Sequence, residues 1–344
     1  MAERKVTRAL VIGDGSWGTT LAVLLVRNGI ACALWSAFPE HAEEMRKARE
    51  NKRFLPGVEL PRAIDVTADP HRAAEGAELV LSVVPTQFLR GVATRFEDAL
   101  PGTMAIVSAT KGIEIETFKT PSQILTEVLG QRSICVLTGP SHAEEVALQK
   151  PAAVLAASHD QVFAQRVQAA LASPTFRVYT HRDPLGAELA AALKNVIAIA
   201  AGISDGLGLG DNAKAALLTR GMVEMARYGR ARGASPKTFF GLAGFGDLVT
   251  TCCSRHSRNR SVGESIGRGE KLEDVLSRMK MVAEGVWTAK ALFGPEADLG
   301  DISMPIAEQV HAVLFDGKDP REAVLHLMSR APTDEMDGAL GSEA

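Results

Sequence analysis

Aromatic residues are scarce in this sequence of 344 residues, where Phe, Trp and Tyr together make up 5%. Ala, Val, Leu and Ile must therefore fill most of the core. Hydrophobic residues as a whole reach 46%, which is ordinary for a globular protein. The length suffices for two domains with a sizeable core each.

The sequence also lacks a dominant charge, because 41 Asp and Glu residues stand against 38 Lys and Arg, a formal net charge of -3. This balance gives the chain as a whole no attraction to nucleic acid or to an anionic membrane surface. Any preference for anions must come from a local cluster of donors.

Cysteine is rare, and the four cysteines, Cys32, Cys135, Cys252 and Cys253, form no C-x-x-C pair. This spacing disfavours a zinc site and a thioredoxin-like redox pair, and adjacent cysteines are poorly placed to bridge each other. We therefore expect reduced thiols, no bound metal and a cytoplasmic location.

Long apolar runs are missing too. No stretch of about 18 uncharged apolar residues is present, so we expect no membrane span. The first apolar run, Leu10-Val11-Ile12, meets glycine too early for the core of a signal peptide.

Short apolar runs alternate with helical stretches over the first half of the chain. Strands are predicted at 9–12, 30–35, 79–84, 104–107 and 134–137, and a helix at 19–28. This alternation predicts an α/β domain, with a doubly wound parallel sheet covered by helices on both faces.

The pattern changes near Asp183-Pro184. Helices are predicted at 185–201, 213–232, after Ser257 and at 304–315, and no convincing strand follows. We therefore predict an α/β domain over residues 1–184 and an all-helical domain over 185–330. The acidic tail, 331–344, lacks periodicity and is predicted to be disordered.

A glycine-rich turn follows the first predicted strand and opens a helix: Gly13-Asp14-Gly15-Ser16-Trp17-Gly18 fits G-x-G-x-x-G. In this setting Gly13 allows the tight turn, Gly15 lets the backbone approach a pyrophosphate and Gly18 lets the helix pack on the strand. The free N–H groups at the helix start then face the phosphates. The turn predicts that residues 1–184 bind a dinucleotide.

The end of the second strand usually distinguishes the two nicotinamide dinucleotides. An acid there binds the ribose 2′-hydroxyl of NAD, and an Arg accepts the 2′-phosphate of NADP. The residues present, Trp35-Ser36-Ala37-Phe38, are neither, so the sequence leaves the cofactor choice open.

Two lysines are candidates for the proton donor that a carbonyl oxygen needs when hydride reduces its carbon. Lys194 lies in a strongly apolar predicted helix, where burial would lower its pKa, although it could equally extend to the surface. Lys111 follows the strand at 104–107, where ligands of doubly wound sheets gather, and this position favours a ligand contact over an exposed loop lysine.

A basic cluster, Arg255-His256-Ser257-Arg258-Asn259-Arg260, mixes arginines with neutral hydrogen-bond donors. This mixture suits a phosphate group, although a solvated charged loop has the same composition. Nucleic-acid binding is disfavoured, because the cluster is short and has no interleaved aromatic residues.

With these motifs the chain resembles the bacterial-type NAD(P)-dependent glycerol-3-phosphate dehydrogenases, from about Leu10 to about Arg330. Besides the glycine turn, the resemblance is carried by Asn51-Lys52-Arg53-Phe54-Leu55-Pro56-Gly57, Lys111-Gly112, Thr138-Gly139-Pro140-Ser141-His142-Ala143, Leu193-Lys194-Asn195, Gly241-Leu242-Ala243-Gly244-Phe245-Gly246-Asp247-Leu248 and Ser257-Arg258-Asn259-Arg260.

The resemblance implies a Rossmann-like domain followed by a helical substrate-binding domain like the C-terminal one of 6-phosphogluconate dehydrogenase. It implies an oxidoreductase acting on a CH–OH group, which transfers hydride reversibly from NAD(H) or NADP(H) to dihydroxyacetone phosphate and so makes sn-glycerol 3-phosphate for glycerophospholipid synthesis. It also suggests a homodimer.

The resemblance implies residue roles as well. Lys194 would exchange the proton and touch substrate, and Lys111 and Arg258 would contact both substrate and cofactor. The other implied substrate contacts are Gly139, Ser141, Asp247, Ser257 and Asn259, and the other cofactor contacts are Gly13, Gly15, Ser16, Trp17, Gly18, Phe54, Ala143, Val282 and Glu284.

Two positions depart from the family pattern. Asp14 stands where the family often has Ala or Asn, and it places an anion near the pyrophosphate. Ala37 stands where many members have His or Arg near the adenosine ribose, which weakens the expectation of an NADPH preference.

Three other readings compete. A dehydrogenase of a 3-hydroxy acid or of ketopantoate would need a carboxylate clamp, whereas residues 257–260 suit a phosphate. A non-catalytic nucleotide sensor would keep the glycine turn without needing Lys194. A nucleic-acid binder would show steeply salt-dependent binding.

Overall fold

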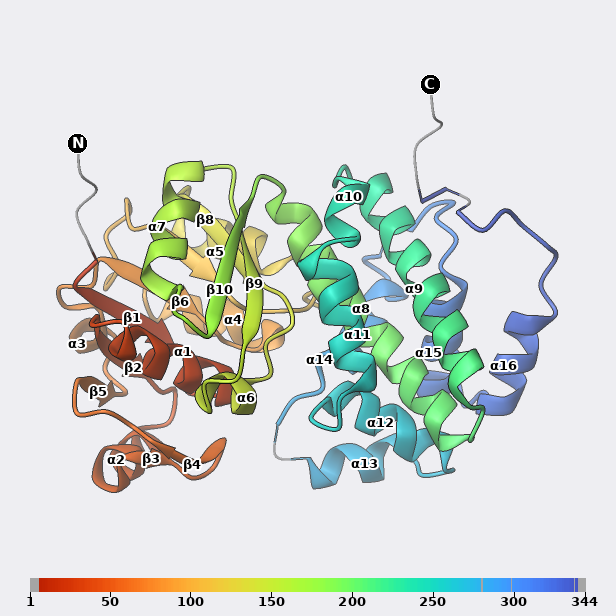
Figure 1. Ribbon diagram of the computed structural model, residues 1–344, viewed down its shortest axis with the longest axis horizontal. Helices are drawn as coiled ribbons and strands as arrows, with labels where there is room; N and C mark the ends of the chain where they lie inside the picture. The colour runs from red at the N-terminus through yellow and green to blue at the C-terminus, as the bar shows by residue number, and fades with distance from the viewer. Residues whose placement is uncertain (1–5, 280, 298, 337, 340–344) are drawn as a thin grey trace. The chain divides into compact units, whose positions relative to one another are not determined.

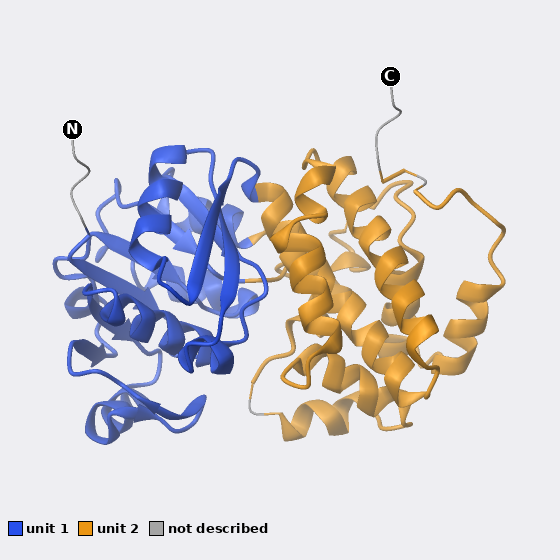
Figure 2. Cartoon of the chain, viewed as in Figure 1, with its two compact units in different colours: residues 1–110, 121–184 blue, residues 111–120, 185–344 orange. Residues whose placement is uncertain are grey.

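The computed structural model describes residues 6–279, 281–297, 299–336, 338 and 339. Its internal contacts divide the chain into two compact units (Figure 2). Unit 1 comprises Met1–Thr110 and Pro121–Pro184, and unit 2 comprises Lys111–Thr120 and Leu185–Ala344. The boundary between Pro184 and Leu185 falls where the sequence pattern changes. The segment Lys111–Thr120, however, which the sequence placed inside the first domain, belongs to unit 2.

Unit 1 is built on an eight-stranded sheet in the order β10-β9-β8-β7-β6-β1-β2-β5 (Figure 1). Neighbouring strands are parallel except β8 and β9, which are antiparallel. Its strands are β1 (Arg8–Ile12), β2 (Ala31–Trp35), β5 (Ile64–Thr67), β6 (Leu79–Ser82), β7 (Ile106–Ser108), β8 (Ile134–Thr138), β9 (Ala152–Ala157) and β10 (Phe176–His181). A separate antiparallel pair consists of β3 (Glu50–Asn51) and β4 (Leu55–Glu59).

Helices cover both faces of this sheet. Consecutive strand residues fall into different core clusters, Val11 and Leu81 into one and Leu10 and Val80 into the other, because side chains alternate across a strand. The predicted doubly wound α/β fold is thereby confirmed. The helices of unit 1 are α1 (Ser16–Arg27), α2 (Pro39–Ala48), α3 (Pro70–Ala74), α4 (Thr86–Thr94), α5 (Pro121–Leu129), α6 (Ala143–Ala147) and α7 (Gln161–Leu171).

Unit 2 is helical, and none of its described residues lies in a strand. Its elements are α8 (Pro184–Gly206), α9 (Asp211–Ala231), α10 (Pro236–Phe239), the π-helical turn η1 (Leu242–Gly246), α11 (Asp247–Cys253), α12 (Arg258–Gly267), α13 (Leu272–Arg278), α14 (Glu284–Leu292), α15 (Pro305–Phe315) and α16 (Pro320–Met328).

The central element of unit 2 is α8. It is long and apolar enough to cross a membrane by length and composition, but its most apolar window is wholly buried inside the protein, as a core helix is. Glycines let α12 pack tightly on it: a Cβ at Gly202 would lie 2.0 Å from the Arg260 carbonyl oxygen, and one at Gly263 would lie 2.0 Å from that of Ile199. This close contact fixes the start of α12 relative to α8.

After α16 the described residues form no helix or strand. Arg220 donates to the carbonyl of Glu335, and Arg230 donates to that of Gly338 at 3.4 Å. The disorder predicted for the tail falls partly on residues 337 and 340–344, which lie outside the described residues, and it stays a prediction.

Candidate active site

The glycine turn in unit 1 leaves room where a pyrophosphate would lie. Gly13 has φ +112°, and a Cβ there would lie 2.7 Å from the Val83 carbonyl oxygen; one at Gly18 would lie 1.9 Å from that of Gly13. Both positions therefore need glycine for the fold. A Cβ at Gly15, in contrast, would meet no atom within 4 Å, and no side chain caps α1 there. The open position and the uncapped helix start fit a dinucleotide phosphate.

Asp14 does not point its charge at this opening. Its buried carboxylate accepts a hydrogen bond from the Ser36 hydroxyl at 2.6 Å and lies 3.5 Å from Nε2 of His41. Its carbonyl accepts from the Asn51 side chain at 2.6 Å. The anion expected near the pyrophosphate is thus engaged at the end of β2, and the departure from the family pattern does not disturb the turn.

The loop that carries Phe54 is tied to the same turn. The Asn51 side chain accepts from the Phe54 N–H at 3.1 Å, and the Phe54 ring lies edge-on to His41 with centroids 5.5 Å apart. The structure therefore places Phe54 against His41 of α2, the helix that follows β2. The adenosine half of a dinucleotide would be expected at the end of β2.

The loop after β8 carries the next predicted contacts. Gly139 has φ +141°, and the Ser141 hydroxyl donates back to the Gly139 carbonyl at 3.0 Å. Ala143 begins α6, and its carbonyl accepts from Thr20 of α1 at 3.1 Å. Trp17 packs against the small cluster that contains Ala143. The structure thus brings Ala143 and Trp17 together next to the glycine turn.

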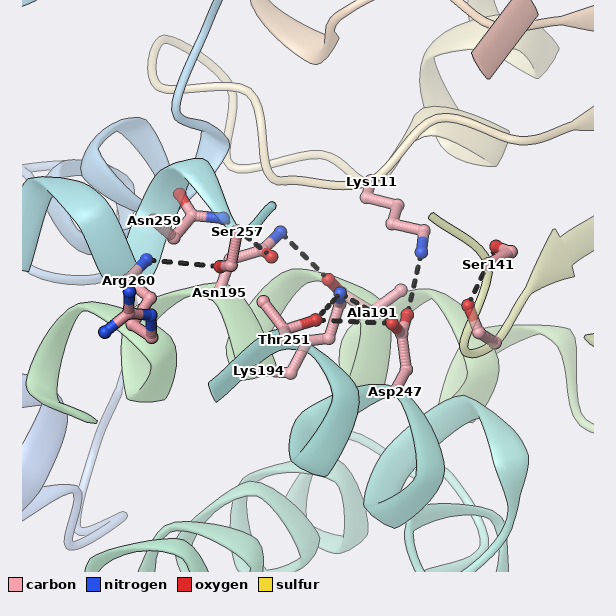
Figure 3. A network of polar contacts seen from close by, with 11 residues as sticks. Lys111, Ser141, Ala191, Lys194, Asn195, Asp247, Thr251, Ser257, Asn259 and Arg260 are labelled. Carbon is pink, nitrogen blue, oxygen red and sulfur yellow. Dashed lines mark hydrogen bonds and ion pairs between the residues drawn. The ribbon is translucent and has the colours of Figure 1, made fainter. Parts of the chain in front are cut away.

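In unit 2 a buried carboxylate joins the two candidate lysines (Figure 3). Lys194 of α8 donates to Oδ1 of Asp247 at 2.8 Å and to the hydroxyl of Thr251 at 2.6 Å. Lys111 donates to Oδ2 of Asp247 at 2.7 Å. Lys194 is only 4% exposed, so the alternative that it extends to the surface is wrong. Two of its three ammonium donors are used within the described structure, and one remains for a ligand oxygen.

The turn η1 holds Asp247 in this position. A Cβ at Gly244 would lie 1.9 Å from the Phe239 carbonyl oxygen, so the chain can pass only with glycine there. Asp247 then begins α11, and Thr251 follows one turn later on the same face. Thr251 belongs to none of the sequence motifs. Only its position four residues after Asp247 could have indicated that the two side chains lie on one helix face.

The charges of this cluster shift one another's protonation. Burial lowers the pKa of Lys194 to about 8, with Lys111 adding to the effect and Asp247 opposing it. Burial alone would raise the pKa of Asp247, but the ammonium groups of Lys111 and Lys194 hold it below its ordinary value. The cluster therefore combines an ionised carboxylate with a lysine that can exchange a proton near neutral pH.

The second polar group of unit 2 is the start of α12. The hydroxyl of Ser257 accepts from the Arg260 N–H at 3.2 Å and caps the helix. The Asn259 side chain donates to Asn195 at 2.9 Å and accepts from the Gly285 N–H at 2.9 Å. Asn259 thus links α12 to α8 beside Lys194 (Figure 3). Through Gly285 it also links α12 to the start of α14.

Arg258 and Arg260 separate in role. Arg258 is exposed and donates to the carbonyl of Val282 at 2.8 Å, close to Glu284, the first residue of α14. Arg260 donates to Asp205 at 2.7 Å and to the Ser254 carbonyl at 3.1 Å, so it braces the loop before α12. Among the described residues no group of three or more His, Cys, Asp or Glu side chains could hold a metal ion.

Comparison with known proteins matches both units to a pair of family models. Residues 8–164 match the model described as NAD-dependent glycerol-3-phosphate dehydrogenase N-terminus, and residues 183–325 match that of the C-terminus.

Curated relatives and a solved structure agree. A glycerol-3-phosphate dehydrogenase [NAD(P)+] of Chlorobium phaeobacteroides (strain BS1) is 49% identical over 95% of this chain and 98% of its own. One of Geobacter sp. (strain M21) is 52% identical over 93% and 96%. The crystal structure of glycerol-3-phosphate dehydrogenase from Coxiella burnetii superposes with a TM-score of 0.90 at 38% identity, covering 95% of this chain and 99% of that one. This chain therefore belongs to the NAD-dependent glycerol-3-phosphate dehydrogenase family.

Proposed function

We propose that this chain reduces dihydroxyacetone phosphate to sn-glycerol 3-phosphate with NADH or NADPH, and catalyses the reverse oxidation. The observation that carries the proposal is the buried ammonium of Lys194, held by Asp247 and Thr251 with one donor left over. Family membership and relatives named for this reaction support it.

Proton transfer is assigned to Lys194. When a ketone is reduced, negative charge develops on its oxygen, and a positioned acid stabilises that charge by donating a proton. Asp247 fixes the direction of the Lys194 ammonium and offsets its charge, while Lys111 leaves the cluster with a net positive charge that favours an anionic substrate. In the oxidation direction the neutral amine would take up the alcohol proton.

The substrate phosphate is assigned to the start of α12. The uncommitted N–H groups of a helix start attract phosphate, and Arg258 adds a fixed positive charge. The Asn259 amide is engaged with Asn195 and Gly285, so its proposed contribution is its main-chain N–H. Gly139 and Ser141 remain proposed substrate contacts.

The dinucleotide is assigned to the glycine turn of unit 1, where Gly15 is open and α1 is uncapped. When bound, it would supply the hydride. Gly13, Ser16, Trp17, Gly18, Phe54 and Ala143 of unit 1 are the proposed contacts there, with Lys111, Arg258, Val282 and Glu284 of unit 2.

One pair of variants tests the role of Lys194. Lys194→Met keeps most of the side-chain volume but removes the transferable proton, so turnover should fall about 10²- to 10⁴-fold. Quenching of protein fluorescence by NADPH should persist. The exposed Lys237 of α10 gives the control: Lys237→Met should keep full activity. Normal turnover of Lys194→Met would remove the assigned role.

The same assay separates the competing functions. Wild-type protein should oxidise NADH or NADPH with dihydroxyacetone phosphate and should not do so with ketopantoate or a 3-oxo acid. Binding of NAD(P)H without oxidation in the presence of any of these compounds would instead identify a nucleotide sensor.

The cellular setting is also proposed. A cytoplasmic homodimer that supplies glycerol 3-phosphate for glycerophospholipid synthesis fits the family and the unpaired cysteines. Light scattering of the purified protein should give twice the mass of one chain; a monomeric mass at assay concentrations would contradict the dimer.

A further inference from the structure

The end of β2 carries no charged side chain, although this is where doubly wound dehydrogenases distinguish the two nicotinamide cofactors. Ser36 is the one polar side chain between Trp35 and Phe38. Its hydroxyl donates to the Asp14 carboxylate at 2.6 Å and accepts from the Phe38 N–H at 3.2 Å. Ser36 is therefore already engaged, and recognition of a 2′-phosphate would need a donor from another element.

Such a donor is held beside the end of β2 by the β3–β4 loop. The guanidinium carbon of Arg53 lies 5.9 Å from the centroid of the Phe38 ring and 5.0 Å from that of Phe54. Phe38 is the third residue after β2, which ends at Trp35, so these ring contacts place a permanent positive charge close to the end of that strand. Within the described residues the Arg53 guanidinium has no carboxylate partner.

The loop that presents Arg53 is fixed rather than free. The Asn51 side chain donates to the Asp14 carbonyl at 2.6 Å and to the Thr19 hydroxyl at 2.8 Å, and it accepts from the Phe54 N–H. These bonds join the Arg53 loop directly to the glycine turn. The position of the guanidinium is therefore set by the same residues that shape the phosphate site.

The ring contacts leave the N–H groups of the Arg53 guanidinium available for a phosphate. Cation–π contact occupies the faces of a guanidinium, whereas its N–H groups point outward in its plane and can bind a phosphate in bidentate fashion. The neighbouring cations are less suitable. The Arg49 guanidinium already donates to the carbonyls of Leu60, Pro61 and Ile64. Among the residues that the structure describes, no aromatic ring contacts the Lys52 ammonium.

We propose that Arg53 binds the 2′-phosphate of NADPH and is the specificity-determining residue for the phosphorylated cofactor in this chain. The inference rests on the proposed placement of the dinucleotide at the glycine turn. In other doubly wound dehydrogenases an arginine at the end of β2 binds the 2′-phosphate. Here Arg53 would bind it from the β3–β4 loop instead. It also means that Ala37, at the β2 end, does not exclude NADPH.

Calorimetry with two nucleotide fragments tests this directly on the full-length protein. Adenosine 2′,5′-bisphosphate carries the 2′-phosphate, and 5′-AMP lacks it. Arg53→Gln should weaken binding of the bisphosphate about tenfold to hundredfold and change 5′-AMP affinity less than about threefold. The ratio of kcat/KM for NADPH to that for NADH should fall by the same factor.

Lys52→Gln is the matched control, because it removes an adjacent exposed cation from the same loop. Lys52→Gln should leave the affinities for adenosine 2′,5′-bisphosphate and for 5′-AMP within about threefold of wild type. The salt dependence of bisphosphate binding should decrease only slightly. An equal loss of both ligands in Arg53→Gln would mean that Arg53 only shapes the loop, and unchanged bisphosphate binding would mean that the 2′-phosphate lies elsewhere. Either result overturns the proposal.

A third variant separates failure of this inference from failure of the cofactor placement. Gly15 has room for a Cβ and an extended backbone (φ −61°, ψ 174°), so Gly15→Ala should fold normally. The added methyl group should weaken NADP and NAD alike. If neither affinity changes, the dinucleotide does not lie at the glycine turn, and the assignment of Arg53 fails together with that placement.

Discussion

Lys194 is subject to opposing influences, since burial and Lys111 disfavour its charge while Asp247 favours it, and the pKa settles at about 8. Reduction needs the protonated amine, so kcat/KM with dihydroxyacetone phosphate should be constant at low pH and fall as the pH rises through about 8. Oxidation of glycerol 3-phosphate needs the neutral amine and should rise over the same range. Initial rates in both directions between pH 6 and 10 measure this.

Removing the Asp247 carboxylate tests whether Lys194 sets the pH at which the rates change. Asp247→Asn takes away the negative charge that favours the ammonium, so the apparent pKa in the rate profile should move downward while the maximum rate also drops. A midpoint that stayed in place in this variant would assign the titration to another group.

Single residues also show how far the sequence could lead. Lys194, Lys111, Asp247 and the 257–259 segment were found from motifs, and the structure links the first three through hydrogen bonds. Whether Lys194 was buried could not be decided, because a lysine in an apolar helix can also extend to the surface. The roles of Thr251 and of the Asp14–Ser36 pair depend on contacts across 57 and 22 residues, which no local pattern records.

Among the elements, the turn η1 offers the sharpest test of how backbone shape supports the site. Gly244→Ala would force a Cβ against the Phe239 carbonyl, 1.9 Å away, and displace the start of α11 with Asp247. We expect a loss of about 1–3 kcal/mol of stability and a marked fall in turnover. Thermal unfolding and the standard assay measure the two effects.

Gly241→Ala is the control within the same segment. Its Cβ would lie 3.5 Å from the nearest atom, an ordinary contact, and its φ of −93° suits any residue. This variant should remain active and nearly as stable as wild type. Equal damage from both substitutions would show that the segment responds to helix propensity rather than to the tight passage at Gly244.

Element assignment from sequence succeeded where apolar runs were rich in branched residues, as in β1, β6 and β8. It missed β5, β9 and β10 of the main sheet and the separate β3–β4 pair. Residues 152–157 read Ala-Ala-Val-Leu-Ala-Ala, and alanine has little preference for strands. β10 alternates buried and exposed residues at its start, unlike the continuous apolar runs used as the signal. Their pairing with the sheet, antiparallel at β8–β9, is set by tertiary contacts.

Within unit 2 as a whole, stability should depend on pH through Glu224. This buried carboxylate on α9 accepts from the N–H groups of Ile306 and Ala307 at the start of α15, at 2.8 and 2.9 Å. Burial raises its pKa to about 7, above the ordinary value of 4.5. The unfolded chain therefore releases this proton more readily, and stability should fall as the pH rises from about 4.5 to about 7.

Urea unfolding of wild type and Glu224→Gln at pH 5 and pH 8 isolates this contribution. The wild type should lose on the order of 3 kcal/mol more than the variant between the two pH values, because the variant cannot ionise at this position. Identical pH dependence in the two proteins would contradict the assignment.

At the scale of the chain, the change from strands to helices near residue 184 was visible in the sequence, and the units divide there. The transfer of Lys111–Thr120 to unit 2 was not visible. It follows from distant partners: Lys111 binds Asp247, and the Phe118 ring lies 5.6 Å from the guanidinium carbon of Arg232. The sequence of this loop between β7 and α5 does not indicate which unit it packs against.

Because Lys111–Thr120 belongs to unit 2, hybrids of two such proteins cannot be made by a single exchange of the C-terminal part. The backbone passes between the units three times, at 110/111, 120/121 and 184/185. A hybrid spliced once at 184 would pair Lys111 from one parent with Asp247 from the other. Exchanging a complete helical unit would therefore require grafting two separate stretches of the gene, the one that encodes Lys111–Thr120 and the one that begins at Leu185.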